Sequence, residues 1–325
     1  MSVSVIIPIY KVEDYIDRCA RSVFEQTYSD IEYIFVNDCT PDRSIEILEH
    51  VMKDYPERAE HVIILNHEQN MGHTPTRNDG MKAATGEWLF FMDADDVIVP
   101  ECISLLYEEA QKYRDVEMVM GFSVSIPSIA EYEALHFMDK YDYIDNNLKI
   151  RQLTYRVGAS LPPVFWNKLI RRSFIIDNSL YSMGNIIYQD NLWFYRVSQK
   201  LNKLAFCHVP TYLYYCKREN STVNGASRKK LSRSWSYICR SVIEHLDEPL
   251  RKQQVVRYWY CLLSFCIPSG NMGLIMRYTA KLIHYNCFGL LFVSFIYLFT
   301  YPLHKGNRFL WRVKEKALQY NVGAN

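Results

Sequence analysis

Five consecutive apolar residues, Trp88 to Met92, lead directly into an acidic turn that holds Asp93, Asp95 and Asp96. A short apolar run of this kind is typical of a buried β-strand. Ligands of open α/β sheets bind at the carboxyl ends of the strands. Carboxylates gathered there repel one another, whereas a hard cation such as Mg²⁺ is bound by one or two carboxylates and substrate phosphates. The pattern therefore indicates either a metal site or a plain acidic turn after a strand.

Strand and helix patterns alternate around this turn through the first hundred residues. Strands are expected at residues 3–7, 31–36, 62–65 and 88–92, and helices at residues 12–24, 45–55 and 77–84. Such alternation predicts a parallel sheet wrapped in βαβ units. A helix over residues 101–114 and a strand over residues 116–125 follow, after which the pattern is mixed up to residue 225 and predicts few elements. Long helical patterns return after residue 227.

Charge is distributed unevenly along the chain. Of its 325 residues, 49% are hydrophobic and 22% are charged, which is ordinary for a globular protein of one or two domains. Residues 226–325 carry 15 Lys and Arg against 4 Asp and Glu, while the first 225 residues carry 22 against 32. An acidic body followed by a basic region suggests that the basic region either meets an anionic partner or is a solvated face.

Two features bear on location. The nine cysteines have no C-x-x-C spacing and several lie in apolar runs, so we expect reduced cysteines in a cytoplasmic protein without a signal peptide. Residues Cys287 to Leu303 form a mostly apolar stretch with basic residues on both sides. This stretch is compatible with a buried core helix, with a helix lying in a membrane interface, or with a spanning helix.

Polar side chains follow each of the four expected strands. They are, in chain order, Tyr10, Asp38, Arg77 and Asp93. A parallel sheet brings them to one crevice, where an aromatic ring, a guanidinium and carboxylates would suit a base, a ribose and a metal-bound diphosphate. The sequence has neither of the common glycine-rich phosphate motifs. An NAD-dependent dehydrogenase is thereby excluded, and the phosphates are expected to be held by a cation.

Taken together, these motifs resemble those of the family 2 glycosyltransferases of GT-A fold, over roughly the first 225 residues. The matching stretches are Ser4–Tyr10, Val36–Asp42, Asn70–Gly72 with Arg77–Asn78, Asp93–Asp96 and Phe165–Leu169. The resemblance implies an α/β protein with a Rossmann-like, mostly parallel sheet flanked by helices, here with a mainly helical C-terminal extension. We expect residues 1–125 to bind the nucleotide sugar, residues 126–225 to supply the acceptor site and catalytic base, and residues 226–325 to associate with a membrane.

The resemblance also implies roles for single residues near the nucleotide. Pro8, Tyr10 and Asp38 would hold the base, with Asp38 accepting a hydrogen bond from a uracil N–H. Asn70 and Arg77 would help to position the nucleotide.

Further roles concern the ribose and the diphosphate. By the same resemblance, Asp93 would reach the ribose, and Asp95 would ligate the Mn²⁺ or Mg²⁺ that bridges the diphosphate. The block Tyr214–Ser221 resembles a family block whose basic residue approaches the diphosphate, which is either Lys217 or Arg218 here.

Asp190 is the candidate catalytic base. The apolar spacing of Trp193, Phe194 and Val197 predicts a helix that begins close to it. A carboxylate at a helix N-terminus is stabilised in its charged form, ready to accept a proton, although it can also be only a helix cap. The block resembles a Glu-Asp motif of the family whose Asp is the base, and Gln189 replaces the Glu.

The sequence predicts an inverting, metal-dependent glycosyltransferase that moves a sugar from a UDP-sugar to a hydroxyl of a glycan or lipid-linked acceptor in surface polysaccharide synthesis. The family's processive Q-x-x-R-W motif is absent from the sequence, so single transfer is expected. We expect the enzyme to be peripheral at the inner face of the plasma membrane and not to bind nucleic acid. A catalytically silent nucleotide-sugar or glycan-binding module and, less favoured, a nucleotidyltransferase remain as alternatives.

Overall fold

The computed structural model describes residues 2–127, 138–156, 160–216, 226–266, 272–288 and 291. The chain forms two compact units. The first consists of Met1–Ile150, Pro163–Asn185 and Gln189–Glu219, and the second of Arg151–Pro162, Ile186–Tyr188 and Asn220–Asn325. The expected division at residues 125 and 225 stays a prediction.

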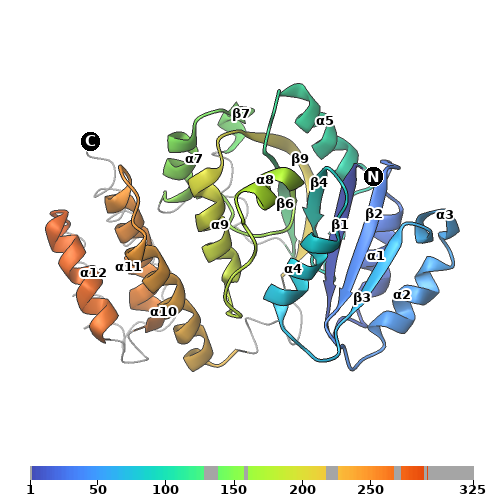
Figure 1. Cartoon of the computed structure of the whole chain (residues 1–325), viewed down its shortest axis with the longest axis horizontal. Coiled ribbons are helices and arrows are strands. Elements are labelled where there is room, and N and C mark those ends of the chain that lie inside the picture. Colours follow the sequence, from blue (N-terminus) through green and yellow to red (C-terminus); the bar gives the residue numbers. More distant parts are fainter. Residues whose placement is uncertain are drawn as a thin grey trace. The chain divides into compact units, whose positions relative to one another are not determined.

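One mixed sheet forms the centre of the first unit (Figure 1). Its strands are β1 (Val3–Ile9), β2 (Ile31–Asn37), β3 (Val62–Asn66), β4 (Trp88–Phe91), β5 (Val97–Ile98), β6 (Met118–Ile126), β7 (Tyr143–Ile144), β8 (Lys168–Arg171) and β9 (Leu204–Tyr215). Their order is β3-β2-β1-β4-β8-β6-β9-β5, and β7 pairs with β9. The expected parallel group β3-β2-β1-β4 is confirmed. Beyond it, β8 runs antiparallel to both of its neighbours.

Helices flank this sheet. They are α1 (Ile16–Phe24), α2 (Ser44–Met52), α3 (Pro56–Ala59), α4 (His73–Ala83), α5 (Cys102–Lys112), α7 (Asn147–Thr154), α8 (Arg172–Asp177) and α9 (Gln189–Lys200). One difference from the prediction is α4, which begins four residues before the expected Arg77. Pro75 lies in its first turn, where proline is tolerated because the N–H it lacks would have no helical partner.

Pro8 was expected to end the first strand, and that expectation is wrong. β1 continues to Ile9, and Pro8 pairs with Val36 of β2. Ile6, two residues earlier, accepts a hydrogen bond from Met92 on the β4 side. Pro8 points the same way, past the last residue that pairs with β4, so its missing N–H breaks no bond of the sheet.

The apolar run before the acidic turn is buried on both faces of the sheet. All four residues of β4 are at most 1% exposed. A strand covered on both faces has no reason to alternate polar and apolar residues, which explains the continuous run. Helix α4 approaches β1 closely at Gly80, where an added Cβ would lie 2.4 Å from Ile6 Cγ2. These contacts hold the strand ends, and the turn after β4, at a fixed edge of the sheet.

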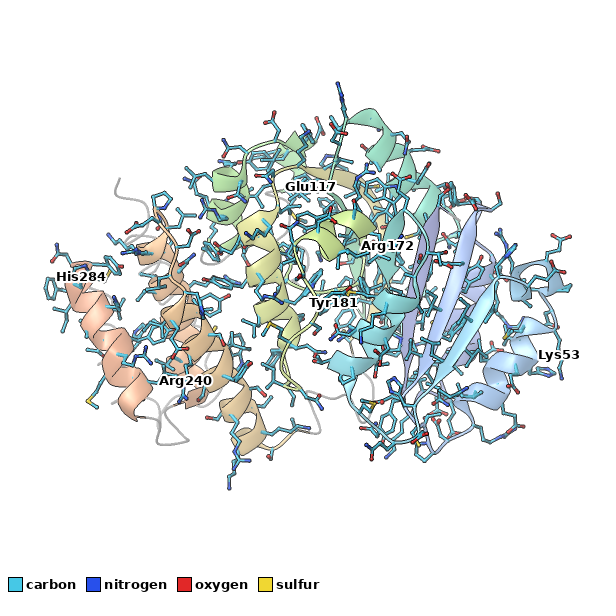
Figure 2. All side chains as sticks on the ribbon, viewed as in Figure 1. Lys53, Glu117, Arg172, Tyr181, Arg240 and His284 are labelled. Atoms are coloured by element: carbon cyan, nitrogen blue, oxygen red, sulfur yellow. The ribbon has the colours of Figure 1, made fainter. Side chains whose placement is uncertain are left out.

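The second half of the sheet was not predicted in detail. β8 has only four residues and gives little pattern, and β9 contains a register shift opposite β6. Long-range contacts hold these strands, as two side chains labelled in Figure 2 illustrate. Glu117 accepts hydrogen bonds from the backbone N–H groups of Asn202 and Lys203, at 2.6 and 3.0 Å. Arg172 Nε donates to the carbonyl of Gly86 at 2.9 Å, just before β4.

The second unit contains three consecutive helices, as expected for this region. They are α10 (Arg228–Glu244), α11 (Arg251–Cys266) and α12 (Met272–His284). The Tyr278 hydroxyl of α12 donates to the carbonyl of Cys239 in α10 at 2.7 Å. Among the described helices, none has the length and apolar character needed to cross a bilayer. Most of the apolar stretch Cys287 to Leu303 lies outside the described residues.

Candidate functional site

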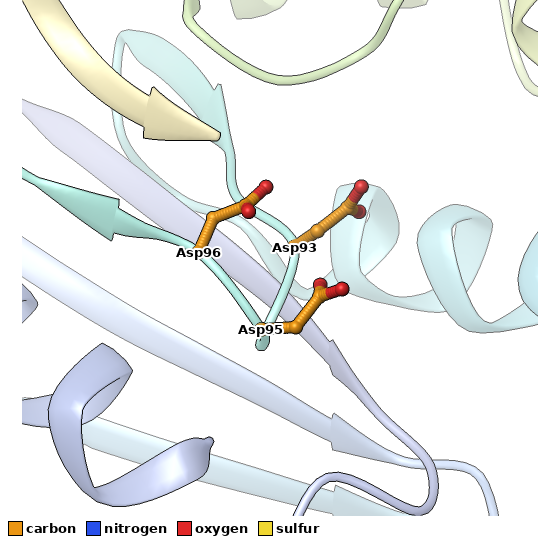
Figure 3. Close-up of side chains that lie close together, drawn as sticks. All are labelled: Asp93, Asp95 and Asp96. Atoms are coloured by element: carbon orange, nitrogen blue, oxygen red, sulfur yellow. The ribbon is translucent and has the colours of Figure 1, made fainter. Parts of the chain in front are cut away.

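The acidic turn between β4 and β5 gathers three carboxylates. One ligand atom each from Asp93, Asp95 and Asp96 can be chosen so that all lie within 4.8 Å of one another. The three side chains project to the same side of the turn (Figure 3). The sequence pattern thus becomes a real cluster of acidic oxygen atoms at the carboxyl end of a parallel strand.

Asp96 is the structural member of the cluster. It is completely buried and accepts hydrogen bonds from the Tyr212 hydroxyl at 2.7 Å and the Tyr215 N–H at 2.9 Å. Burial, together with repulsion from Asp95 and Asp93, raises the pKa of Asp96 to about 8, and both hydrogen bonds oppose that rise. The Tyr212 hydroxyl also accepts from the backbone N–H of Asp93. The end of β9 therefore fixes the turn, a contact that the sequence did not reveal.

Arg18 holds the other side of the turn. Its Nη2 donates to the carbonyl of Asp95 at 2.7 Å. Its guanidinium lies 3.7 Å from the centre of the Tyr215 ring and 5.1 Å from that of Tyr15. The backbone of Asp95 is thus anchored while its carboxylate lies beside that of Asp93.

Arg77 lies on α4 and contacts the acidic turn directly. Its Nη2 forms an ion pair with Asp93 Oδ1 at 3.0 Å, and the guanidinium is 4.8 Å from the centre of the Phe165 ring. Arg77 is buried, and its charge also acts on Asp190. The sequence correctly predicted that Arg77 and Asp93 lie at the same edge of the sheet, but it did not show that they pair with each other.

Asp38 organises the turn before α4. Its carboxylate accepts hydrogen bonds from the N–H groups of Met71 at 2.7 Å and Gly72 at 2.8 Å, and lies 2.8 Å from His67 Nδ1. Asn70 Nδ2 contacts the Asp38 carbonyl at 3.4 Å. Asp38 and Asn70 are therefore adjacent, and the contacts of Asp38 show a role in holding this turn. Its expected contact with a uracil base stays a prediction.

The remaining residues that were expected near the nucleotide sugar have different surroundings. Tyr10 follows β1 and is 39% exposed, with Lys11 Nζ 5.5 Å from its ring centre. Pro8 lies within β1 at the same edge. Lys217 and Arg218 lie outside the described residues, so the basic residue expected near the diphosphate stays a prediction.

Asp190 is the second residue of α9, which confirms the expected helix start. Its Oδ1 accepts from the backbone N–H of Asn191 at 3.0 Å and from the side-chain amide of Asn191 at 3.2 Å. Burial raises the pKa of Asp190, while the charge of Arg77 and the bonds from Asn191 lower it. The result is a carboxylate with a raised affinity for a proton, which the charge of Arg77 partly offsets.

A set of hydrogen bonds ties α4 to the segment before α9. The Thr74 hydroxyl donates to the carbonyl of Gly184 at 2.8 Å and also contacts Gln189 Oε1. Asn78 exchanges two bonds with the backbone of Ser182, at 2.8 and 3.0 Å. Gln189 is buried, and its side-chain oxygen accepts this bond from Thr74, which links the start of α9 to α4.

The acidic cluster has the donor set of a hard divalent cation. Mn²⁺ and Mg²⁺ prefer oxygen ligands, and the three carboxylates supply them on one side of a single turn. The burial and mutual repulsion that raise the pKa of Asp96 are the conditions that a cation would relieve. Asp95 is the expected ligand of such an ion, and this assignment and the expected contact of Asp93 with the ribose stay predictions.

Comparison with known proteins gives one consistent match. A family model described as Glycosyl transferase family 2 matches residues 4–177. The chain is 44% identical over 293 residues to the uncharacterized glycosyltransferase EpsJ of Bacillus subtilis (strain 168), covering 89% of this chain and 71% of that protein. It is 25% identical over 250 residues to glycosyltransferase GlyG of Streptococcus pneumoniae serotype 4, covering 74% and 77% respectively.

Solved structures share the fold. Residues 1–349 of S. aureus TarS in complex with UDP-GlcNAc align with a TM-score of 0.64 at 20% identity, covering 83% of this chain and 75% of that one. The mannosyltransferase PcManGT from Pyrobaculum calidifontis, in complex with GDP-Man and Mn²⁺, aligns with a TM-score of 0.61 at 13% identity, covering 99% and 86%. At such identities the likeness concerns the fold alone.

Proposed function

The chain belongs to glycosyl transferase family 2 and has the GT-A fold, and from this membership we propose that it is an inverting, metal-dependent enzyme that uses a UDP-sugar. The sugar would pass to a hydroxyl of a glycan or lipid-linked acceptor. The observation that carries the proposal is the electrostatic link that Arg77 makes from the acidic turn to Asp190. Arg77 pairs with Asp93 of the acidic turn, and its charge acts on Asp190 at the start of α9.

The proposed reaction is a single displacement. The acceptor oxygen attacks the anomeric carbon while its proton passes to an Asp190 carboxylate oxygen. The bond between that carbon and the diphosphate oxygen breaks, and its electron pair leaves with UDP. Since attack comes from the face opposite the leaving group, the configuration at the anomeric carbon inverts.

Leaving-group departure needs positive charge near the diphosphate. A bound Mn²⁺ or Mg²⁺ would neutralise the charge that develops there. Asp95 is the proposed ligand, with Asp93 beside it, and Arg77 orients Asp93. Arg18 and β9 keep the backbone of this turn in place, so that the carboxylates are organised before the donor arrives.

Relatives guide the choice of substrate class. TarS, which shares the fold, was crystallised with UDP-GlcNAc. A poly(ribitol-phosphate) beta-glucosyltransferase of Bacillus spizizenii is 27% identical over 230 residues, which cover 70% of this chain. These similarities support a UDP-sugar donor and an acceptor in cell-surface polysaccharide synthesis.

A peripheral position at the inner face of the plasma membrane is part of the proposal. Residues 226–325 carry 15 basic against 4 acidic residues. On α12 and just after it, Met276, Ile283 and Phe288 are exposed apolar side chains near Lys281. Basic and apolar side chains together favour attachment to an anionic lipid surface.

A donor screen tests the proposal. Thermal unfolding and sugar hydrolysis are measured with a panel of UDP-sugars and with GDP-mannose, each with Mn²⁺, with Mg²⁺ and with EDTA. We expect one UDP-sugar to protect the protein and to be hydrolysed only with a divalent cation. Equal protection in EDTA would contradict the metal, and preference for GDP-mannose would contradict the UDP assignment. Binding without turnover, even with acceptor glycans, would favour the silent binding module, whose only sequence support was Gln189.

A further inference from the structure

His67 is a histidine at the carboxyl edge of the sheet to which the proposed reaction gives no role. It directly follows β3, and its side chain is 9% exposed. Its backbone N–H donates to the carbonyl of Asn37 at 2.9 Å, which continues the pairing of β3 with β2 by one residue. The backbone that carries the ring is therefore fixed by the sheet.

Both nitrogens of the His67 ring lie close to carboxylates. Nδ1 lies 2.8 Å from Asp38 Oδ1, and Nε2 lies 3.3 Å from Asp79 Oδ2. Asp38 directly follows β2, whereas Asp79 lies on α4. A carboxylate only accepts hydrogen bonds, so Nδ1 carries a proton, and the ring can donate to both groups as an imidazolium. His67 thus links the ends of β2 and β3 to α4.

The bond from His67 occupies part of the Asp38 carboxylate. An ionised carboxylate has about four acceptor positions, two on each oxygen. Oδ1 accepts from His67 Nδ1 and from the Met71 N–H at 2.7 Å, and Oδ2 accepts from the Gly72 N–H at 2.8 Å. Among the contacts of the described residues, one acceptor position therefore remains, and it is on Oδ2. The Asp38 side chain is 5% exposed, so a ligand can reach only a small part of it.

We infer that His67 is a positioning residue for base recognition, which occupies Oδ1 of Asp38 and thereby directs Oδ2 to a single N–H of the nucleotide base. Uracil fits this arrangement because it has one ring N–H, placed between two carbonyl oxygens. The inference rests on the proposed function for the contact of Asp38 with uracil, whereas the bond between His67 and Asp38 is a property of the folded protein. His67 acts through Asp38 and not by touching the nucleotide.

Asp79 contacts the other side of the ring. Its Oδ1 pairs with Lys82 at 2.8 Å, and its Oδ2 is the atom that lies near His67. The Asp79 side chain is 33% exposed, so solvent screens this contact more than it screens the bond to Asp38. We therefore expect the affinity for the base to depend on the bond to Asp38 and much less on the contact with Asp79.

Two substitutions separate the two nitrogens of the ring. The amide nitrogen of Asn takes roughly the place of Nδ1 of His, and that of Gln roughly the place of Nε2. His67→Asn therefore keeps a donor for Asp38, whereas His67→Gln keeps a donor for Asp79 only. The matched control is His50→Gln, which changes an exposed histidine of α2.

Calorimetric titration of the full chain, with Mn²⁺ present, tests the inference. The ligands are UDP and UDP that carries a methyl group in place of the uracil N–H, so the ratio of their affinities reports the contact with Asp38. We expect the wild type, His50→Gln and His67→Asn to prefer UDP by at least about tenfold, as for one hydrogen bond to a charged group. In His67→Gln the carboxylate can turn away, and this preference should fall about tenfold.

Two negative outcomes of the titration have different meanings. An unchanged preference for UDP in His67→Gln would overturn the positioning role of His67 and leave the contact of Asp38 with uracil intact. Equal affinity of the wild type for both nucleotides would contradict that contact itself, and the role of His67 with it.

NMR of the wild type gives a second measurement that does not depend on the folding of His67→Gln. With ¹⁵N-labelled histidine, the Nδ1–H of His67 should give a slowly exchanging proton signal that is missing in His67→Asn. We expect this signal to persist when UDP is added, because Asp38 keeps His67 as a partner while it binds the base. Loss of the signal on addition of UDP would contradict the inference.

Turnover separates positioning from general damage to the site. In hydrolysis of the UDP-sugar that best protects the protein, His67→Gln should raise KM about tenfold and leave kcat nearly unchanged, because the base lies away from the reacting bond. His67→Asn should restore KM, and Asp79→Asn should change it by less than about threefold. A fall in kcat with unchanged KM would contradict a role in base recognition.

Discussion

The two acidic regions of the site are held in different ways. In the acidic turn, β9 donates two hydrogen bonds to Asp96 and Arg18 binds the carbonyl of Asp95. At the start of α9, the hydrogen bonds that reach the carboxylate of Asp190 come from its own neighbour, Asn191. Elements far away in the sequence hold the acidic turn by hydrogen bonds, whereas they act on Asp190 through charge.

This difference matches the two chemical tasks proposed for these regions. A carboxylate that binds a cation needs a constant position, which the hydrogen bonds that hold this turn provide. A carboxylate that takes up a proton must change its charge during the reaction, so strong fixed donors would oppose it. The raised pKa of Asp190 and the anchored backbone of Asp95 are each suited to one of these tasks.

The largest effect is expected from Asp190→Asn. An amide cannot accept the proton, so kcat should fall by about 10²–10⁴-fold. Protection by the UDP-sugar against thermal unfolding, measured relative to the variant alone, should persist. Full transfer by this variant would reduce Asp190 to a helix-end residue and remove the contrast between the two regions.

Asp95→Asn should act on the other region. The variant should lose Mn²⁺-dependent donor protection and about 10²-fold in kcat, because charge at the leaving group is no longer neutralised. Calorimetric titration with Mn²⁺ and UDP measures the binding, with the exposed Asp14→Asn as control. Unchanged metal-dependent binding would show that Asp95 is not a ligand.

Asp96→Asn should affect stability more than chemistry. At a pH above about 8, where Asp96 is ionised, the side-chain NH₂ group of Asn would face the Tyr215 N–H or the Tyr212 hydroxyl as a donor against a donor, at a cost of about 1–3 kcal/mol in the free energy of unfolding. Tyr212→Phe, which removes only the hydroxyl, should cost about 1 kcal/mol. Urea unfolding measures both. If Asp96→Asn were as stable as the wild type, the hydrogen bonds to Asp96 would not be what holds this turn in place.

The smallest effect is a shift in pH dependence. Because burial raises the pKa of Asp190, kcat should fall as pH decreases through that pKa and the base becomes protonated. Arg77→Met removes a cation that favours the ionised form of Asp190. The fall of kcat on the acid side of the kcat–pH profile should therefore move to higher pH. The kcat–pH profile of the two proteins tests this. A fall that stays in place or moves to lower pH would show that charge from α4 does not govern the base.

The fold was predictable where neighbouring segments along the chain pair with each other. β1 to β4 are β-branched or apolar runs separated by helices, and right-handed crossovers put them in one parallel sheet. β8 escaped prediction because four residues inserted antiparallel between β4 and β6 leave no periodic pattern. Such a strand is specified by partners that lie about fifty to eighty residues away, and no local rule identifies them.

The site was predictable as a set of residue types and less so as a set of contacts. Asp93, Asp95 and Asp190 could be named because strand ends and helix starts are visible in the sequence. Tyr212 and Arg18 could not, since each contacts the acidic turn from a position far away in the sequence.

The bonds between α4 and the segment before α9 bear on protein engineering. Asn78 binds the backbone of Ser182, Thr74 binds that of Gly184, and Asn185 binds the carbonyl of Met71. Gly72 has φ +87°, and a Cβ there would come within 2.4 Å of Asn185. A graft of residues 182–189 from a relative would therefore need residues 71–78 from the same source. The two segments form one structural unit, and libraries aimed at the proposed acceptor site should vary them together.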